Sequence, residues 1–82
     1  MNNRDDHIRE ELARIQHEIW ANWMRYLFDV SIMNNDGTLT IPVDKVNRWN
    51  RQVNTHYSEL SEEEKESDRE LADKLLVVLT SK

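Results

Sequence analysis

Four side chains that could bind a small molecule lie along one edge of a predicted helix: Lys45, Trp49, Gln52 and His56. Residues three or four positions apart are neighbours on the surface of an α-helix, so these four share one side. A lysine cation and an indole ring could hold a phosphate and stack a base, and the other two groups form hydrogen bonds. In the simpler interpretation, Trp49 belongs to the core and its neighbours are solvated.

The sequence carries none of the familiar patterns for catalysis or metal binding. It has no cysteine nucleophile and no glycine-rich phosphate loop. His17-Glu18 lacks the second histidine of an H-E-x-x-H zinc motif. The Asn35-Asp36-Gly37 stretch looks like part of a calcium loop, but Ile32 and Val43 would then stand where oxygen ligands are needed. We therefore expect no enzyme activity, no metal and no cofactor.

Composition places the chain among small helical domains. Its 82 residues are 38% hydrophobic and 33% charged, with one glycine and one proline. A sheet protein needs more turn residues, so we expect a single all-α domain over residues 1–82. The lack of cysteine argues against a disulfide framework, and no apolar run approaches the roughly 20 residues of a membrane span. With its polar amino terminus, the chain is expected to be cytoplasmic.

One long helix is predicted within the stretch from Ile8 to Met33, ending near Val30, and it has two apolar faces. At 100° per residue, one face collects Ile8, Leu12, Ile15, Ile19, Trp23, Tyr26 and Val30. The second face collects His17, Trp20, Ala21, Met24 and Phe28. Such a helix must be covered from two sides, and each of the later helices supplies only one apolar stripe. We therefore expect a homodimer or a higher homo-oligomer.

Two shorter helices follow a turn at Gly37 and an extended connector, Thr38–Ile41, that is too short for a sheet. The first should run from Pro42 to Thr55, since proline suits the first turn of a helix. Its buried face is expected to comprise Val43, Val46, Trp49, Asn50 and Val53.

The last helix should run from Ser61 to Thr80, because Ser61 and Glu64 have the spacing of a capping box. Its expected apolar face contains Leu71, Ala72, Leu75, Leu76, Val78 and Leu79. The whole prediction is a small three-helix domain in which the long amino-terminal helix is the spine.

Asp68 falls inside the predicted apolar face of the last helix. A buried carboxylate is costly unless hydrogen bonds compensate it. We therefore expect Asp68 to be buried and to accept a hydrogen bond from His17 or from a tryptophan indole N–H.

Two stretches of the sequence resemble a known family. The segment Y-S-E-L-S-E-E-E-K-E-S-D-R, Tyr57 to Arg69, resembles the signature of the RyR domain. His17-Glu18-Ile19-Trp20-Ala21 is similar to the H-x-x-W-A element in the first helix of that family. The RyR domain is a small module named for its repeats in ryanodine receptors, and it also occurs alone in bacterial and phage proteins. The whole chain is similar to short proteins carried by phages and prophages.

The resemblance implies two alternative roles for the matching residues. In a structural role, His17, Trp20 and Asp68 would lock the first and last helices together. RyR-type domains are also suspected of binding adenine-containing nucleotides. In that ligand-binding role, aromatic rings would stack on a base and cations would contact phosphate, the candidates being Trp20, Trp49 and Tyr57 with Lys45, Arg48, Lys65 and Arg69.

Two classes of function remain open. The net charge of −5 argues against a duplex nucleic acid as partner, because such binding rests on a basic surface. A phage-type binding module could sequester a nucleotide that serves as a defence signal. Alternatively, it could be an interaction module that binds or inhibits a host protein.

Overall fold

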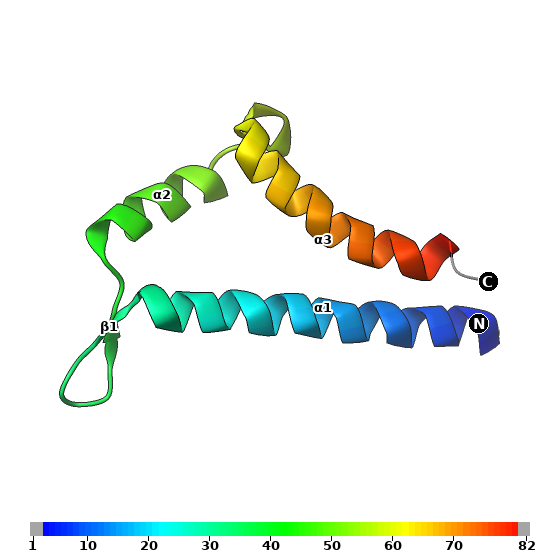
Figure 1. Ribbon diagram of the computed structural model, residues 1–82, viewed down its shortest axis with the longest axis horizontal. Coiled ribbons are helices and arrows are strands. Elements are labelled where there is room, and N and C mark those ends of the chain that lie inside the picture. Colours follow the sequence, from blue (N-terminus) through cyan, green and yellow to red (C-terminus); the bar gives the residue numbers. More distant parts are fainter. Residues whose placement is uncertain (1–2, 81–82) are drawn as a thin grey trace.

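The computed structural model describes residues 3–80 and is mostly helical. Figure 1 shows a long helix along one side of the molecule and two shorter helices on the other side, where they meet at an angle. This arrangement confirms the predicted all-α domain with a long amino-terminal helix. In order, the elements are α1 (Asn3–Val30), β1 (Ile32–Met33), β2 (Leu39–Thr40), α2 (Val43–Val53), the 3₁₀ turn η1 (Tyr57–Glu59) and α3 (Glu62–Thr80). Across the described part of the chain, no helix is long and apolar enough to cross a membrane.

α1 is continuous because no glycine or proline interrupts its 28 residues. Arg14 bridges two carboxylates on successive turns, Glu11 at 3.0 Å and Glu18 at 3.1 Å. Such pairs stabilise an exposed helix only slightly, because water and salt screen the charges. The helix ends where the Ser31 hydroxyl donates a 2.7 Å hydrogen bond to the Leu27 carbonyl.

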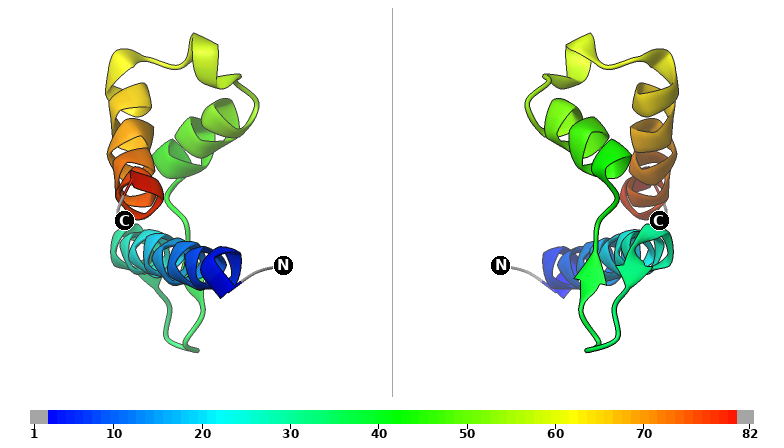
Figure 2. Two further views of the ribbon diagram at one scale, coloured as in Figure 1. Left: turned by 90° about the vertical axis from the view of Figure 1, so that its right-hand side faces the viewer. Right: turned by 90° about the vertical axis from the view of Figure 1, so that its left-hand side faces the viewer.

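A short hairpin follows α1, and here the sequence prediction was wrong. The connector was expected to be too short for a sheet, yet β1 and β2 pair antiparallel, with Ile32 opposite Thr40. The turn supplies the reason: Asp36 accepts hydrogen bonds from the amide and the hydroxyl of Thr38, and Gly37 adopts a φ of 88°. Figure 2 shows the hairpin on the side of α1 opposite α2 and α3.

α2 turns a different face inward from the one predicted. Val43, Val46 and Val53, assigned to the buried face, are exposed, as is Asn50. Trp49, which the sequence placed on both the buried face and the edge, is half-buried as predicted, and its half-buried neighbours are Lys45 and Gln52 of the edge. The Trp49 ring explains this orientation, because it packs against the Trp23 and Tyr26 rings of α1, and such ring contacts add to the stabilisation from burial.

α3 begins at the predicted capping box. The Ser61 hydroxyl accepts a 3.2 Å hydrogen bond from the Glu64 amide, and the Glu64 carboxylate accepts one of 3.2 Å from the Ser61 amide. This pairing satisfies two donors that a helix start would otherwise leave free. From there α3 runs back along α1, so that its carboxyl end lies beside the amino-terminal half of α1 (Figure 1).

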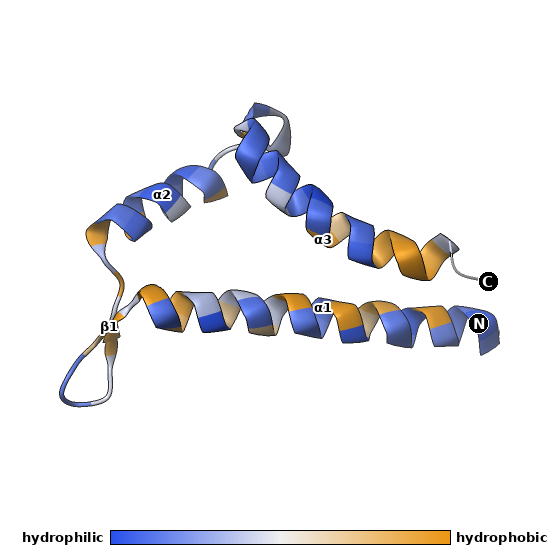
Figure 3. Ribbon diagram, viewed as in Figure 1, coloured by the Kyte–Doolittle hydropathy of each residue, from blue (hydrophilic) through white to orange (hydrophobic). Residues whose placement is uncertain are grey.

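The core between α1 and α3 is thin. Among residues 3–80, Ile15 is the one hydrophobic side chain that is buried. Around it lie half-buried apolar residues from both helices, namely Ile8, Leu12, Ile19, Leu71, Leu75 and Val78. Figure 3 shows apolar residues recurring along α1 and concentrated at the carboxyl end of α3.

The surface of the chain is large for its size. A compact monomer of 9.9 kDa exposes about 5,200 Å², whereas this chain exposes 6841 Å². Its radius of gyration is 16.7 Å, against about 12 Å for a compact chain of 82 residues. The single chain therefore leaves about 1,600 Å² more surface in water than a compact fold would.

Replacing Ile15 with alanine should cost about 2–4 kcal/mol of unfolding free energy, because no other hydrophobic side chain within residues 3–80 is buried to compensate for the cavity. Leu76→Ala is the matched control on α3, since Leu76 is 53% exposed. It should cost less than about 1 kcal/mol. Urea unfolding followed by circular dichroism compares them, and equal midpoints would contradict a core centred on Ile15.

Candidate functional site

The strongest candidate site is a groove enclosed by α1, α2 and α3, with a cavity of about 850 Å³. Ligand sites in proteins usually measure about 300–1,000 Å³. Four aromatic rings line this groove, three from α1 and one from α2. Its lining comprises Gln16, Ile19, Trp20, Asn22, Trp23, Tyr26, Arg48, Trp49, Gln52, Val53, Leu60, Glu63, Glu64, Ser67, Asp68 and Leu71.

Three of the four rings form one cluster that joins α2 to α1. Trp23 and Tyr26 stack with their centroids 5.3 Å apart, and Trp49 presents its edge to Trp23 at 5.4 Å and to Tyr26 at 6.4 Å. Offset and edge-to-face contacts of this kind are worth about 0.5–1.5 kcal/mol beyond the burial of area. Yet Trp23 remains 48% exposed and Trp20 54% exposed. The rings therefore hold the helices together while leaving apolar surface open in the groove.

An ion pair fixes the corner between α2 and α3. Arg51 Nη2 lies 2.8 Å from Glu64 Oε2, and the other Glu64 oxygen accepts hydrogen bonds from Ser61. Glu64 is the one buried charged residue within residues 3–80. The Arg51 hydrogen bond, with those of Ser61, lowers the pKa of Glu64 from 4.5 to about 2. The carboxylate is therefore charged at neutral pH and joins the capping box to α2.

The remaining charges in the groove are mainly acidic. Glu63 and Asp68 of α3 line it, and Arg48 is the facing cation that is left once Arg51 is paired with Glu64. Arg48 makes no ion pair with another residue of the described chain. Two carboxylates and one guanidinium give the groove a slight net negative charge. This charge favours the binding of neutral or cationic groups over phosphates.

The structure divides the predicted ligand residues into two places. Trp20, Arg48 and Trp49 line the groove. Tyr57, Lys65 and Arg69 do not; they gather at the corner between η1 and α3, where the Lys65 ammonium lies 5.9 Å from the centre of the Tyr57 ring. Lys45 lines neither place. The seven residues therefore do not form one nucleotide site within the single chain.

The cations at the η1–α3 corner already have carboxylate partners. Arg69 lies 3.1 Å from Glu62 and 3.2 Å from Glu66, and Lys65 lies 3.8 Å from Glu62. Hydrogen bonds to these two glutamates raise the pKa of Arg69 above its usual value. A phosphate arriving at this corner would have to displace the glutamates that now neutralise it.

The predicted lock of His17, Trp20 and Asp68 needs correction. Asp68 is exposed, and no hydrogen bond reaches it from the described residues, so its predicted burial is wrong. His17 is exposed too, with its ring centre 5.7 Å from that of Trp20. The buried acid of α3 is Glu64, one turn earlier, because Arg51 reaches that position across the corner. Asp68 instead faces the open groove.

Sequence reasoning placed Trp23 and Tyr26 in the core and did not connect them with a site. Their spacing of three residues on α1 was the signal available, but the partner ring of Trp49 became visible only with α2 in place. Ser67 and Glu63 carried no signal, because exposed polar residues in the first turns of a helix are ordinary.

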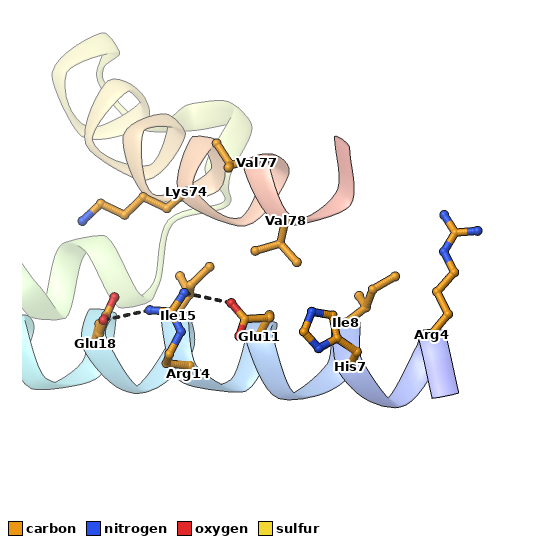
Figure 4. A pocket seen from close by; sticks show the side chains of 10 residues that line it. All are labelled: Arg4, His7, Ile8, Glu11, Arg14, Ile15, Glu18, Lys74, Val77 and Val78. Atoms are coloured by element: carbon orange, nitrogen blue, oxygen red, sulfur yellow. Dashed lines mark hydrogen bonds and ion pairs between the residues drawn. The ribbon is translucent and has the colours of Figure 1, made fainter. Parts of the chain in front are cut away.

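A second cavity, of about 970 Å³, lies between the first half of α1 and the end of α3. Figure 4 shows its charged edge, where Arg14 lies between Glu11 and Glu18. Hydrogen bonds and charge from these glutamates raise the pKa of Arg14, so its cation is already neutralised. No group of three or more His, Cys, Asp or Glu residues that could hold a metal ion occurs within residues 3–80.

In comparisons with known proteins, no family model, no curated protein and no solved structure matches the chain. The resemblance of Tyr57–Arg69 to the RyR domain therefore stays a prediction.

The pKa of Glu64 leads to a pH-dependent prediction. Because the folded value is lowered from 4.5 to about 2, the charged carboxylate stabilises the fold above pH 4.5, and this stabilisation is lost as pH falls toward 2. Glu64→Gln should therefore lower the melting temperature at pH 7, and the gap to the wild type should narrow between about pH 5 and pH 2. Glu63→Gln, one residue earlier, is the control. A gap that stayed constant over this range would contradict the Arg51–Glu64 pairing.

The exposure of Asp68 predicts that Asp68→Ala changes the unfolding free energy by no more than about 0.5 kcal/mol, as at other surface positions. Glu64→Ala removes the carboxylate that caps α3 and pairs with Arg51, so it should destabilise the fold clearly more than Asp68→Ala. Chemical unfolding of both variants measures this. A larger loss for Asp68→Ala would restore the idea of a buried lock.

Proposed function

We propose that this protein is a non-catalytic interaction module whose groove binds an apolar, helical segment of a partner protein. The observation that carries the proposal is the row of partly exposed aromatic rings, Trp20, Trp23, Tyr26 and Trp49, along one groove. Tryptophan and tyrosine, together with arginine, are enriched at the energetic centres of protein interfaces. Monomeric proteins seldom leave such rings together in water.

The shape of the groove supports a segment of protein chain. It lies between helices that diverge from one another, and its floor is formed by the face of α1 from Gln16 to Tyr26. That stretch spans ten residue steps, or about 15 Å along the helix axis. An amphipathic partner helix of about two to three turns would match this length. Its apolar residues at positions i, i+3 or i+4, and i+7 would pack on the rings.

The charges along the groove suggest the chemistry of the partner's flanks. Glu63 and Asp68 lie on the α3 side and make no ion pair within residues 3–80. A partner with lysine or arginine beside its apolar stripe would pair with these carboxylates. Complementary charges at the edge of an interface mainly raise the association rate and select the partner.

Nucleotide sequestration is the second candidate, because Trp20, Arg48 and Trp49 do line one cavity. Two indoles could stack on a base, and Arg48 could contact a phosphate. A thermal-shift screen with linear and cyclic nucleotides tests it, since ligand at 100 times its dissociation constant adds about 2.7 kcal/mol of stability. Arg48→Glu should then abolish the shift. No shift with any nucleotide would leave the protein partner as the function.

Selection from a displayed peptide library tests the interaction module directly. Peptides with apolar residues at helical spacing and basic flanks should be enriched, and Trp20→Ala should abolish their binding. Trp20 suits this test because its ring contacts His17 and takes no part in the Trp23–Tyr26–Trp49 cluster. Enrichment of acidic peptides, or binding that survives Trp20→Ala, would contradict the proposed site.

Charge reversal tests the groove edge separately from the rings. Asp68→Lys should weaken a selected basic peptide about tenfold at low salt, a change of about 1.4 kcal/mol. Asp73→Lys is the matched control, because Asp73 is an exposed aspartate of α3 outside the groove. Equal weakening by both variants would show a general charge effect, and the groove edge would lose its role.

A further inference from the structure

One apolar surface of the chain lies mostly outside the groove, on the side of α1 that faces away from α2 and α3. It is formed by Ala13, His17, Trp20, Ala21, Met24 and Phe28, which we call the outer face. At 100° per residue, its centre lies about 160° from the stripe that contains Ile15 and Ile19. No lysine, arginine or carboxylate interrupts the outer face between Ala13 and Phe28.

The outer face is open to water in the single chain. Trp20 and Phe28 are each 54% exposed, whereas Met24 and Ala21 are half-buried. The hairpin lies on the same side of α1 and adds exposed Ile32 and Met33 (Figure 2). An apolar helix side of this kind is normally covered by another element. All the helices of residues 3–80 are already engaged elsewhere.

We propose that a second copy of this chain covers the outer face, with the two α1 helices packed antiparallel about a twofold axis. The surface area supports this occupant. Each chain exposes about 1,600 Å² more than a compact monomer of its mass, and a standard-size interface removes about 800 Å² from each partner. A dimer of this kind therefore accounts for about half of the excess, and the groove accounts for part of the rest.

The order of side chains along the outer face favours the antiparallel arrangement. The midpoint between Ala13 and Phe28 falls between Trp20 and Ala21, so the twofold axis passes there. Each Trp20 then lies against the small Ala21 of the second copy, and each Phe28 against its small Ala13. Large side chains facing small ones is the arrangement that lets two helices approach closely.

Charge disfavours the parallel alternative. The outer side of α1 becomes acidic before Ala13, at Asp6 and Glu10. In a parallel pair these carboxylates would face their own copies, and like charges on opposed helices repel. In the antiparallel pair, they lie at opposite ends of the dimer. The same twofold symmetry makes the contact self-limiting, because each copy uses its outer face once.

Light scattering during size-exclusion chromatography tests the stoichiometry. With a chain mass of 9.9 kDa, the dimer should give about 20 kDa at micromolar concentration. Met24→Asp and Phe28→Asp should each shift the mass to about 10 kDa while far-ultraviolet circular dichroism stays helical. Val77→Asp, at an exposed apolar residue of α3, should remain dimeric. A wild-type mass of one chain, or of three or more, would overturn the proposal, as would a dimer that survives both outer-face variants.

Cross-linking tests the direction of the helices and does not depend on the aspartate variants. The chain has no cysteine, so Ala21→Cys and Ala13→Cys each introduce one thiol per copy. In the antiparallel dimer, the two thiols introduced by Ala21→Cys meet near the axis, whereas those introduced by Ala13→Cys are separated by about 22 Å along the helices. A short bis-maleimide should therefore join Ala21→Cys into a dimer and leave Ala13→Cys uncoupled. Coupling of both variants would indicate parallel helices, and coupling of neither would place the interface elsewhere; either result overturns the proposal.

Discussion

A helix of 28 residues presents apolar side chains on two sides, and the rest of this chain covers only one of them. α1 spans about 42 Å, and α2 and α3 together have about the same length, so laid end to end they reach along α1 once. Their contact with α1 therefore forms a single thin layer centred on Ile15. The groove, the open outer face and the large surface all follow from this constraint.

Only a few contacts, of different kinds, hold α2 and α3 against α1 and against each other. Trp49 binds α2 to Trp23 and Tyr26 through ring contacts, and Arg51 binds α2 to the capped start of α3 through Glu64. The three rings and the Glu64 carboxylate also line the groove between the three helices. The interactions that build the fold thus also shape the candidate site, and its aromatic floor serves both purposes.

The groove and the outer face differ in chemistry, which suggests different occupants. Carboxylates line the α3 side of the groove, and their negative charge favours a partner with basic residues. The outer face has small and large apolar residues in an order that complements itself under a twofold axis. Trp20 is the one residue of the outer face that also lines the groove.

The helices, their approximate ends, the capping box and the bare second face of α1 could all be predicted from the sequence, because they depend on residues within a few positions of one another. The hairpin was missed although its Asp36–Thr38 turn is local, because strands of two residues are too short to show an alternating pattern. The inward face of α2 and the exposure of Asp68 could not be predicted either. Each of these depends on contacts between residues far apart in the sequence: Trp49 packs against the rings of Trp23 and Tyr26, and Arg51 pairs with Glu64, which is the buried acid. Periodicity determines which residues share a side of a helix, but the direction in which that side points is decided only when the helices pack.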